Sequence, residues 1–311
     1  SYIRYVDTDN QSHWLFDSFL FLEIMDTGTG GANKMFAKGY NLESANQADW
    51  TKLIDYYFQS ETGIGALDAS VKEASAILGT PRQKRQIVIS IPEPIVYQHP
   101  EQASSSTKYW GKIDNQTLDF SNSADRIKAC KWYIDQVRAK FNEKNYQHVE
   151  LAGFYWLAEK ATDTRDILNA VANYLNKLKY SFNWIPYYGA DGYNQWKSLG
   201  FNYAYFQPNY FFNESVPDSR LEDACQKALT YDMHMELEFD DNALNSRGKA
   251  YRLKNYMSAF KKHGIWEKKR LAYYQGSASL LALKKSGNAA DTQLYHEFCK
   301  FVISRPIRSS H

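Results

Sequence analysis

Seven short apolar runs, separated by longer segments with helical spacing, constrain the fold of this chain more than any other feature. The runs are FLFLEIM (19–25), QIVISI (86–91), VELAGFYW (149–156), SFNWIPY (181–187), YAYFQ (203–207), MHMELEF (233–239) and RLAYYQ (270–275). Strand-length runs that alternate with amphipathic helices are typical of parallel sheets joined by crossover helices. The sequence therefore predicts an α/β fold.

Seven helical segments are expected in the intervals. They cover residues 46–59, 64–79, 122–144, 164–179, 219–231, 246–263 and 289–303, with Ser123 and Thr164 at positions where helix caps are expected. The first two follow one another with no strand-like run between them, which indicates a degenerate second strand. Counting that strand gives eight βα units and predicts a (β/α)8 TIM barrel. An open doubly wound sheet is the alternative architecture.

The length of the chain suits one large barrel, and the sequence has no internal repeat and no interdomain linker. We therefore expect a single domain over residues 1–311. The longest connection, residues 92–120, is too long for an idle turn. It is predicted to be a loop insertion that walls the active site.

The charge and hydropathy of the chain argue against nucleic-acid binding and membrane insertion. There are 37 Lys and Arg against 35 Asp and Glu, a net charge of +2, which is too near neutrality for a protein that neutralises phosphates. No run of about eighteen apolar residues is present to cross a membrane. The chain begins at Ser1 rather than Met, from which we expect that a signal peptide has been removed.

Acidic and amide side chains recur where the predicted strands end, on the face where a barrel carries its active site. The clearest case is residues 233–241, in which apolar residues alternate with His234, Glu236, Glu238 and Asp240. This alternation directs the apolar side chains to the helices and the polar ones into the barrel. Because buried carboxylates are costly unless they are paired or catalytic, the polar face is a candidate site.

Glu159 follows the fourth strand, when the degenerate strand is counted, and Glu238 ends the seventh. This placement resembles clan A of the retaining glycoside hydrolases, in which the acid/base follows strand four and the nucleophile follows strand seven. The resemblance implies that Glu159 is the acid/base and Glu238 the nucleophile, about 5 to 5.5 Å apart, with Glu236 as the rival nucleophile. The clan has Asn before its acid/base glutamate, whereas this chain has Ala158.

Aromatic residues make up 16% of the chain, and many of them lie at or beyond the ends of predicted strands. Sugar rings stack on Trp and Tyr, while acids and amides bind sugar hydroxyls. The sequence therefore predicts a carbohydrate-binding groove. The residues expected to bind substrate there are Asp26, Trp110, Tyr155, Trp156, Tyr188, Asp191, Gln207, Asn209, Tyr210, Glu236 and Gln275.

Three segments resemble a secreted bacterial family known only as a domain of unknown function, number 4855. They are GFYWLAE (153–159), WIPYYGADGYNQW (184–196) and GFNYAYFQPNYF (200–211). The resemblance covers about residues 19 to 283. It implies a secreted, periplasmic or cell-surface location in a bacterium, and the family's association with polysaccharide-degrading systems is in keeping with a glycosidase.

The sequence thus predicts a monomeric glycoside hydrolase that cleaves a poly- or oligosaccharide with two carboxylates and needs no cofactor or metal. Two alternatives stay open. A non-catalytic carbohydrate-binding barrel is favoured by Ala158. A metal-dependent hydrolase would be built on His234 and the glutamates that share its strand face.

Overall fold

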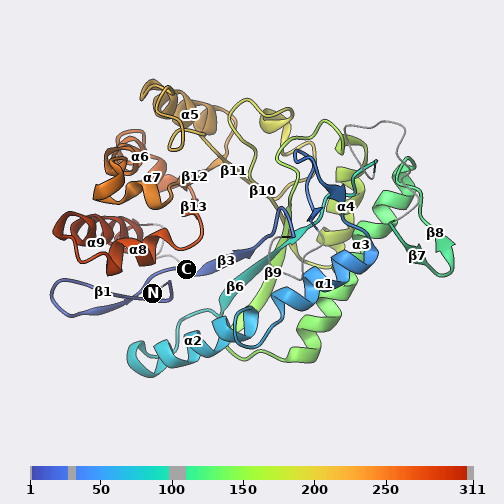
Figure 1. Ribbon diagram of the computed structural model, residues 1–311, viewed down its shortest axis with the longest axis horizontal. Coiled ribbons are helices and arrows are strands. Elements are labelled where there is room, and N and C mark those ends of the chain that lie inside the picture. The colour runs from blue at the N-terminus through green and yellow to red at the C-terminus, as the bar shows by residue number, and fades with distance from the viewer. Residues whose placement is uncertain (1, 27–32, 98–109, 307–311) are drawn as a thin grey trace.

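The computed structural model describes residues 2–26, 33–97 and 110–306, and its centre is a curved sheet of seven parallel strands (Figure 1). The strands are β3 (Ser18–Phe21), β6 (Arg85–Ile91), β9 (Val149–Trp156), β10 (Ser181–Trp184), β11 (Tyr203–Phe206), β12 (His234–Glu238) and β13 (Leu271–Tyr274). Each falls within a predicted apolar run or overlaps it. Their order in the sheet follows the chain without reversal, as in a barrel and unlike a doubly wound sheet.

The barrel is distorted at the position of the second strand. There the chain forms two short strands, β4 (Lys34–Met35) and β5 (Glu43–Ser44), which pair with each other outside the seven-stranded sheet. As a result β3 pairs directly with β6. The predicted degeneracy is therefore present, and it lies before the first of the two successive helices rather than between them.

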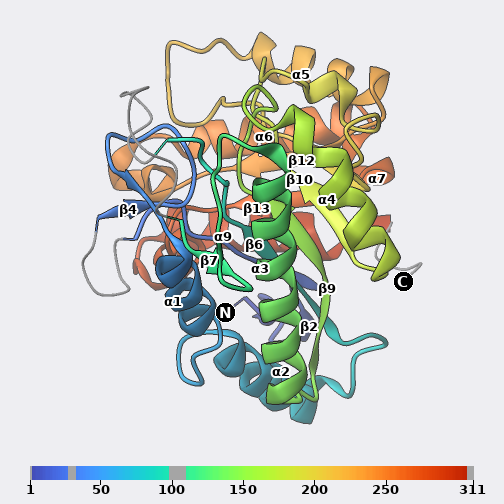
Figure 2. The same cartoon turned by 90° about the vertical axis from the view of Figure 1, so that its right-hand side faces the viewer.

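Helices cover the outer face of the sheet (Figures 1 and 2). The seven predicted helices correspond to α1 (Gln47–Tyr57), α2 (Ile64–Leu78), α3 (Ser123–Lys144), α4 (Arg165–Lys177), α5 (Ser219–Thr230), α6 (Ala250–Lys262) and α9 (Ala289–Ile303). The short helices α7 (Ile265–Lys268) and α8 (Ser279–Lys285) were not predicted. No helix in the described part of the chain is long and apolar enough to span a membrane.

Asparagine side chains begin three of these helices. Asn46 forms a capping box with Asp49 at α1, and Asn122 and Asn288 accept backbone N–H groups at α3 and α9. The expected cap Ser123 is instead the first helical residue of α3. Thr164 stands at the cap position of α4, although its side chain makes no capping hydrogen bond.

The N-terminal segment spans the opening between the two edge strands, β3 and β13. It forms a hairpin of β1 (Arg4–Val6) and β2 (Ser12–Trp14) that leads into β3. The Phe16 ring packs against Tyr273 of β13 with ring centroids 5.4 Å apart. The Tyr2 hydroxyl donates to Oε1 of Gln275 at 3.2 Å. Side chains rather than strand pairing therefore link the two edges of the sheet.

The two faces of the sheet differ in polarity. Alternate residues of β6, namely Ile87, Ile89 and Ile91, are fully buried in the core on the helix side. In β12, Met235 and Leu237 are buried in the same way. The opposite, concave face carries the polar residues of β12, and this asymmetry places carboxyl groups inside the curve of the sheet.

The long connection after β6 is described only in part, because residues 98–109 lie outside the described residues. The described part includes a small hairpin of β7 (Lys112–Ile113) and β8 (Gln116–Thr117). Its N-terminal end is held to the start of α1, where the Lys112 N–H donates to Oε1 of Gln47 at 3.0 Å. The prediction that this insertion walls the active site stays a prediction.

Candidate active site

Three glutamates meet at the carboxyl end of the sheet. Glu236 and Glu238 belong to β12, and Glu159 comes three residues after the end of β9. The side chain of Glu238 is fully buried and that of Glu236 is 6% exposed. Glu159 and Glu236 each lie within reach of the charge of Glu238. The alternation in residues 233–241 thus does bring two carboxyls to the concave face.

Burial and mutual repulsion set the protonation of these carboxyls. Loss of solvation, followed by the nearby charge of Glu238, raises the pKa of Glu159 to about 7. Burial raises the pKa of Glu236 well above its ordinary value, and the charges of Glu238 and Glu159 add to this effect. The surroundings of this site therefore favour the protonated forms of both Glu159 and Glu236 relative to an exposed glutamate.

Glu238 is the best hydrogen-bonded of the three. Nε2 of Gln207 donates to its Oε1 at 3.0 Å, the Asn209 N–H donates to its Oε2 at 2.9 Å, and the Tyr256 hydroxyl donates to Oε2. Burial raises the pKa of Glu238 above its ordinary value, and these hydrogen bonds oppose part of that rise. Glu238 is accordingly the carboxyl that the protein supports most strongly in its ionised form.

A tight turn after β11 delivers two of these donors. Gln207 and Asn209 flank Pro208, and Asn209 adopts a left-handed conformation with φ of 50°. Asn tolerates that conformation better than most residues. Nε2 of Gln207 also donates to Oδ1 of Asn209 at 2.8 Å, so the turn is fixed internally. Both residues were predicted to bind substrate, and both are bonded to a carboxylate.

Helix α6 holds the loop that follows this turn. The Arg252 side chain is 2% exposed, and its guanidinium donates to the carbonyl oxygens of Tyr210, Asn213 and Val216. One turn further along α6, Tyr256 donates to Glu238. Sequence analysis missed Tyr256, because its position fits the buried face of an ordinary amphipathic helix.

Exposed aromatic rings lie beside the carboxyls. Tyr274 pairs with Glu238 in the β12–β13 register, is 45% exposed, and feels the charges of Glu236, Asp240 and Glu238. The Phe212 ring contacts it at 6.0 Å between centroids. Neither ring was predicted. The alternation within LAYY, which puts Tyr274 on the same face as Ala272, is the signal that would have found Tyr274.

Tyr155 is the predicted aromatic residue that does lie at the carboxyls. It is buried on β9, and the charges of Glu159 and Glu236 reach its hydroxyl. Its neighbour Trp156 points the other way into the core, where Nε1 donates to the Thr164 hydroxyl at 3.3 Å. A strand presents successive side chains to opposite faces, so these two residues do not line one groove.

Trp110 and Tyr210 are buried away from solvent, contrary to their expected place in an open groove. Trp110 is 4% exposed and stacks edge-on against Trp50 at 5.0 Å between centroids. Tyr210 is fully buried, with the Arg252 guanidinium 3.7 Å from its ring centroid. Trp110 packs against rings of α1 and α3, and Tyr210 packs against the Tyr256 ring of α6. An aromatic ring next to an apolar layer gains free energy from such burial.

Tyr188 and Asp191 belong to the connection between β10 and β11, and their side chains are directed to helices. The Tyr188 hydroxyl donates to Asp223, and the Arg220 guanidinium lies 3.9 Å from its ring centroid. Asp191 forms an exposed ion pair with Arg165 at 2.8 Å. These contacts hold the connection against α4 and α5 and do not direct either side chain to the glutamates.

Gln275 and Asp26 complete the predicted set. Gln275 accepts hydrogen bonds from the Tyr2 hydroxyl and from the Leu280 N–H at 3.0 Å, so it links the N-terminal segment to α8. Asp26 is 5% exposed and lies near Glu23, whose pKa is raised first by burial and then by the charge of Asp26. The structure does not bring Gln275 to the glutamates.

A further buried carboxyl stands at the end of β6. Glu93 is 6% exposed, accepts the Lys38 N–H at 2.7 Å, and has a pKa raised to about 7, chiefly by burial. Lys38 itself pairs with Asp163 at 3.0 Å, in the loop that carries Glu159. Glu93 therefore ties the segment after β4 to the carboxyl end of the sheet.

The metal-dependent alternative requires a set of converging ligands. Within the described residues, no group of three His, Cys, Asp or Glu side chains is placed to hold a metal ion. His234 is occupied locally, because its Nδ1 accepts the Arg270 N–H at 3.2 Å. Burial and the nearby cations lower its pKa to about 4. The described residues thus give that alternative no support.

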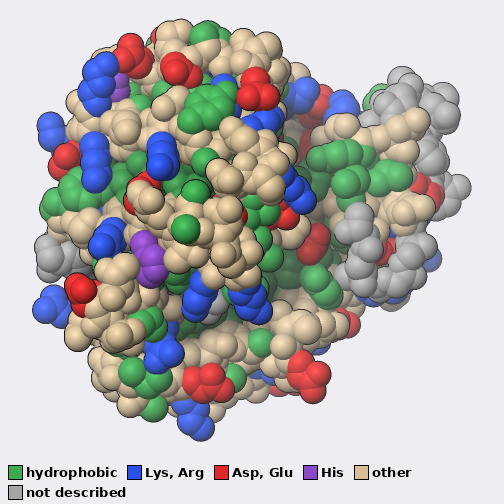
Figure 3. Space-filling model, turned by 60° about the vertical axis from the view of Figure 1, so that its left-hand side comes forward, with side chains coloured by type: hydrophobic (Ala, Val, Ile, Leu, Met, Phe, Trp, Pro, Cys, Tyr) green, Lys and Arg blue, Asp and Glu red, His purple; other side chains and the backbone are tan. Residues whose placement is uncertain are grey.

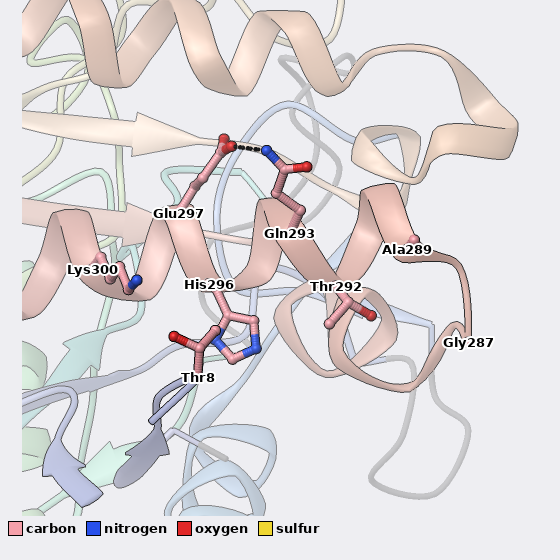
Figure 4. Close-up of a pocket in the computed structure, with 8 residues that line it drawn as sticks. All are labelled: Thr8, Gly287, Ala289, Thr292, Gln293, His296, Glu297 and Lys300. Carbon is pink, nitrogen blue, oxygen red and sulfur yellow. Dashed lines mark hydrogen bonds between the residues drawn. The ribbon is translucent and has the colours of Figure 1, made fainter. Parts of the chain in front are cut away.

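The outer surface offers fewer features. On the face shown in Figure 3, Lys and Arg side chains are interspersed with Asp and Glu rather than gathered in one basic patch. A hollow lies along α9, lined by residues of that helix, the turn before it and Thr8 of the first hairpin (Figure 4). Within it, Nε2 of Gln293 donates to Oε1 of Glu297 at 2.8 Å. This hollow is separate from the glutamates.

The chain was compared with curated proteins, with solved structures and with models of protein families. No curated protein matches it. A crystal structure of a candidate alpha-L-fucosidase from Bacteroides thetaiotaomicron is similar at a TM-score of 0.48 and 13% identity, with 93% of each chain covered. The catalytic domain of a family GH18 chitinase from the fern Peteris ryukyuensis is similar at a TM-score of 0.40 and 12% identity, covering 76% of this chain and 79% of that one. A family model matches residues 1–300, and the chain therefore belongs to the family described as Domain of unknown function (DUF4855).

Proposed function

We propose that this protein is a glycoside hydrolase in which Glu159 is the acid/base and Glu238 the nucleophile. The observation that carries the proposal is the contrast between the two carboxyls. Burial and a neighbouring negative charge keep Glu159 protonated up to about pH 7, while three donors converge on Glu238. Two carboxyls with different protonation preferences are what glycoside hydrolysis uses.

The proposed reaction has two steps. Glu238 attacks the anomeric carbon while Glu159 gives its proton to the departing glycosidic oxygen, which forms a glycosyl-enzyme intermediate. Glu159, now ionised, takes a proton from water, and the resulting hydroxide displaces Glu238 to release the sugar with retained configuration. The hydrogen bonds from Gln207 and Tyr256 would steady Glu238 as a leaving group in the second step.

The second candidate is the non-catalytic carbohydrate-binding barrel, and one observation favours it. The Glu238 side chain is fully buried, and both of its oxygens already accept hydrogen bonds from the protein. Attack on a sugar requires the anomeric carbon to reach one of these oxygens, so the side chains that cover Glu238 must move aside. If they stay in place, the site binds a sugar without cleaving it.

Activity of the separate variants tests the proposal. The wild-type chain is incubated with polysaccharides and with aryl glycosides, and the configuration of the product is read by proton NMR. Glu238→Gln should lose hydrolysis of every substrate. Glu159→Ala should lose hydrolysis of natural glycans by about 100- to 10,000-fold, yet still cleave aryl glycosides whose leaving group needs no proton.

Controls decide between the candidates. Glu150→Gln carries the same kind of change at an exposed position near the amino end of β9 and should behave as wild type. Inverted product, or full activity in Glu238→Gln, would overturn the assigned roles. Sugar binding with no turnover in the wild type would favour the binding-only barrel.

We also propose a secreted bacterial setting, for which fractionation of the native organism is the test.

A further inference from the structure

Glu236 has no hydrogen-bond partner among the described residues, although it is 6% exposed. A largely buried carboxyl without a protein partner is costly, because it has lost most of its contact with water and gained no hydrogen bond in return. Inside a closed core such a group would only destabilise the fold. Beside a candidate active site it points to a ligand that supplies the missing hydrogen bond.

The residues next to Glu236 on the neighbouring strands explain why it receives no hydrogen bond from the protein. On one side its register partner on β13 is Ala272, which has no side-chain donor. On the other side, β11 pairs Phe206 with Met235, so Gln207 stands next to Glu236. The two N–H bonds of the Gln207 amide are directed to Asn209 and Glu238. Ala272 on one side and the occupied amide of Gln207 on the other therefore leave Glu236 without a donor.

Positive charge is scarce around this group. The charges that act on Glu236 are those of Glu238 and Glu159, both carboxyls. Two cations of the surrounding segments are occupied by other partners: Lys38 pairs with Asp163, and the Arg252 guanidinium is bound to carbonyl oxygens. Lys160 acts on Glu93. An acidic sugar would add a further negative charge to this group of carboxyls, whereas a cationic sugar would stabilise the ionised form of Glu236.

The exposed rings complete the environment. Tyr274 lies beside Glu236 and Glu238 with 45% of its surface exposed, and Tyr40 and Phe212 lie next to it at 38% and 40%. An aromatic face stacks against a sugar ring, and it also attracts a cation held over it. Carboxyl and ring together match a sugar that carries an ammonium group.

We propose that Glu236 recognises the ammonium group of an amine-bearing sugar, stacked on Tyr274, at the centre described above. The inference rests on the proposed function in one respect, that a sugar binds at this centre. Binding gives the unpartnered carboxyl a charge-assisted hydrogen bond, and Glu236 releases its proton to water as the ammonium binds. The proposed substrate class is therefore amino sugars, and uronic acids and sulfated sugars are excluded from it.

Binding of simple sugars tests this without any turnover. Glucosamine, galactosamine, their N-acetyl forms, glucose, galactose and glucuronate are titrated by NMR or calorimetry at about pH 6, where the amines are protonated. The free amines should bind at least about tenfold more tightly than the matching neutral sugars. Glucuronate should bind least. Acetylation removes the charge and should remove the preference.

The variants assign the preference to its source. Glu236→Gln keeps the shape and removes the charge, so the preference for amines should fall to about one, while Glu150→Gln should keep it. Failure of both amines to bind, binding equal to that of neutral sugars, or a preference that survives Glu236→Gln would each overturn the proposal. Hydrolysis of neutral glycans with no amine preference would overturn this proposal but support the proposed hydrolase function. Amine-selective binding with no hydrolysis of any glycan would support this proposal but count against the hydrolase function.

Discussion

Tyr256 donates a hydrogen bond to Oε2 of Glu238 from the same helix on which Arg252 grips the loop after β11. That loop begins at the turn whose Asn209 N–H donates to the same oxygen. Helix α6 thus acts on one carboxylate oxygen twice, directly through a hydroxyl and indirectly through backbone carbonyls. The protonation of Glu238 and the stability of the loop are therefore expected to respond together to changes in α6.

Replacement of Tyr256 by Phe should raise the pKa of Glu238, because one donor that favours the ionised carboxylate is lost. The acidic limb of the kcat/KM profile should move to higher pH, and the free energy of unfolding at neutral pH should fall by about 1.5–3 kcal/mol, the usual worth of a hydrogen bond to a charged group. Chemical denaturation and a pH–rate profile measure the two effects. Tyr251→Phe, on the same helix with its hydroxyl donating to the exposed Glu214, is the matched control.

Replacement of Arg252 by Lys should destabilise the loop after β11. The guanidinium reaches three carbonyl oxygens at once, and a single ammonium cannot reproduce that fork, so buried carbonyls lose their donors. We expect a loss of about 2–4 kcal/mol in the free energy of unfolding and faster amide exchange in residues 210–216. Arg247→Lys, at an exposed position, should be neutral. Unchanged exchange in the loop would contradict the role given to Arg252.

Much of the fold was predictable because the spacing of apolar residues indicates which side of a strand or helix faces the core. The alternation in β12 separates Met235 and Leu237 from Glu236 and Glu238, and the structure has that separation. The order of the strands in the seven-stranded sheet was predictable too, since each of these strands pairs with the next one along the chain. The carboxyls that end up together were thus accessible from pattern alone.

The surroundings of these carboxyls were less accessible, for physical reasons. Tyr155 and Trp156 are neighbours in sequence but point to opposite faces. Trp110 sits in a loop, where no period says which way a ring turns, and it packs against Trp50 instead of facing solvent. Tyr256 acts from a helix, and only the rotation of α6 against β12 brings its hydroxyl to Glu238. Such contacts depend on tertiary packing, which local pattern does not encode.

The alkaline limb of the activity profile should lie near pH 7. Glu159 must be protonated to act as an acid, and burial with the charge of Glu238 raises its pKa to about 7. The value of kcat/KM should therefore fall as pH rises through that value. Glu238→Asp should move the limb, because it shifts the charge that acts on Glu159. A profile that stays flat to strongly alkaline pH would contradict the role of Glu159.

The Glu93 carboxyl should make the protein less stable as pH rises towards neutrality. Its pKa is raised from 4.5 to about 7, so between these values the folded protein binds a proton that the unfolded chain has released. The free energy of unfolding should fall across that window by at most about 3 kcal/mol from this group. Glu93→Gln keeps an acceptor for the Lys38 N–H and removes the titration, so its stability should fall less between acidic and alkaline pH than that of the wild type. Urea unfolding at both ends of the window measures the difference, with Glu150→Gln as control, and parallel pH dependence in wild type and Glu93→Gln would rule out this origin.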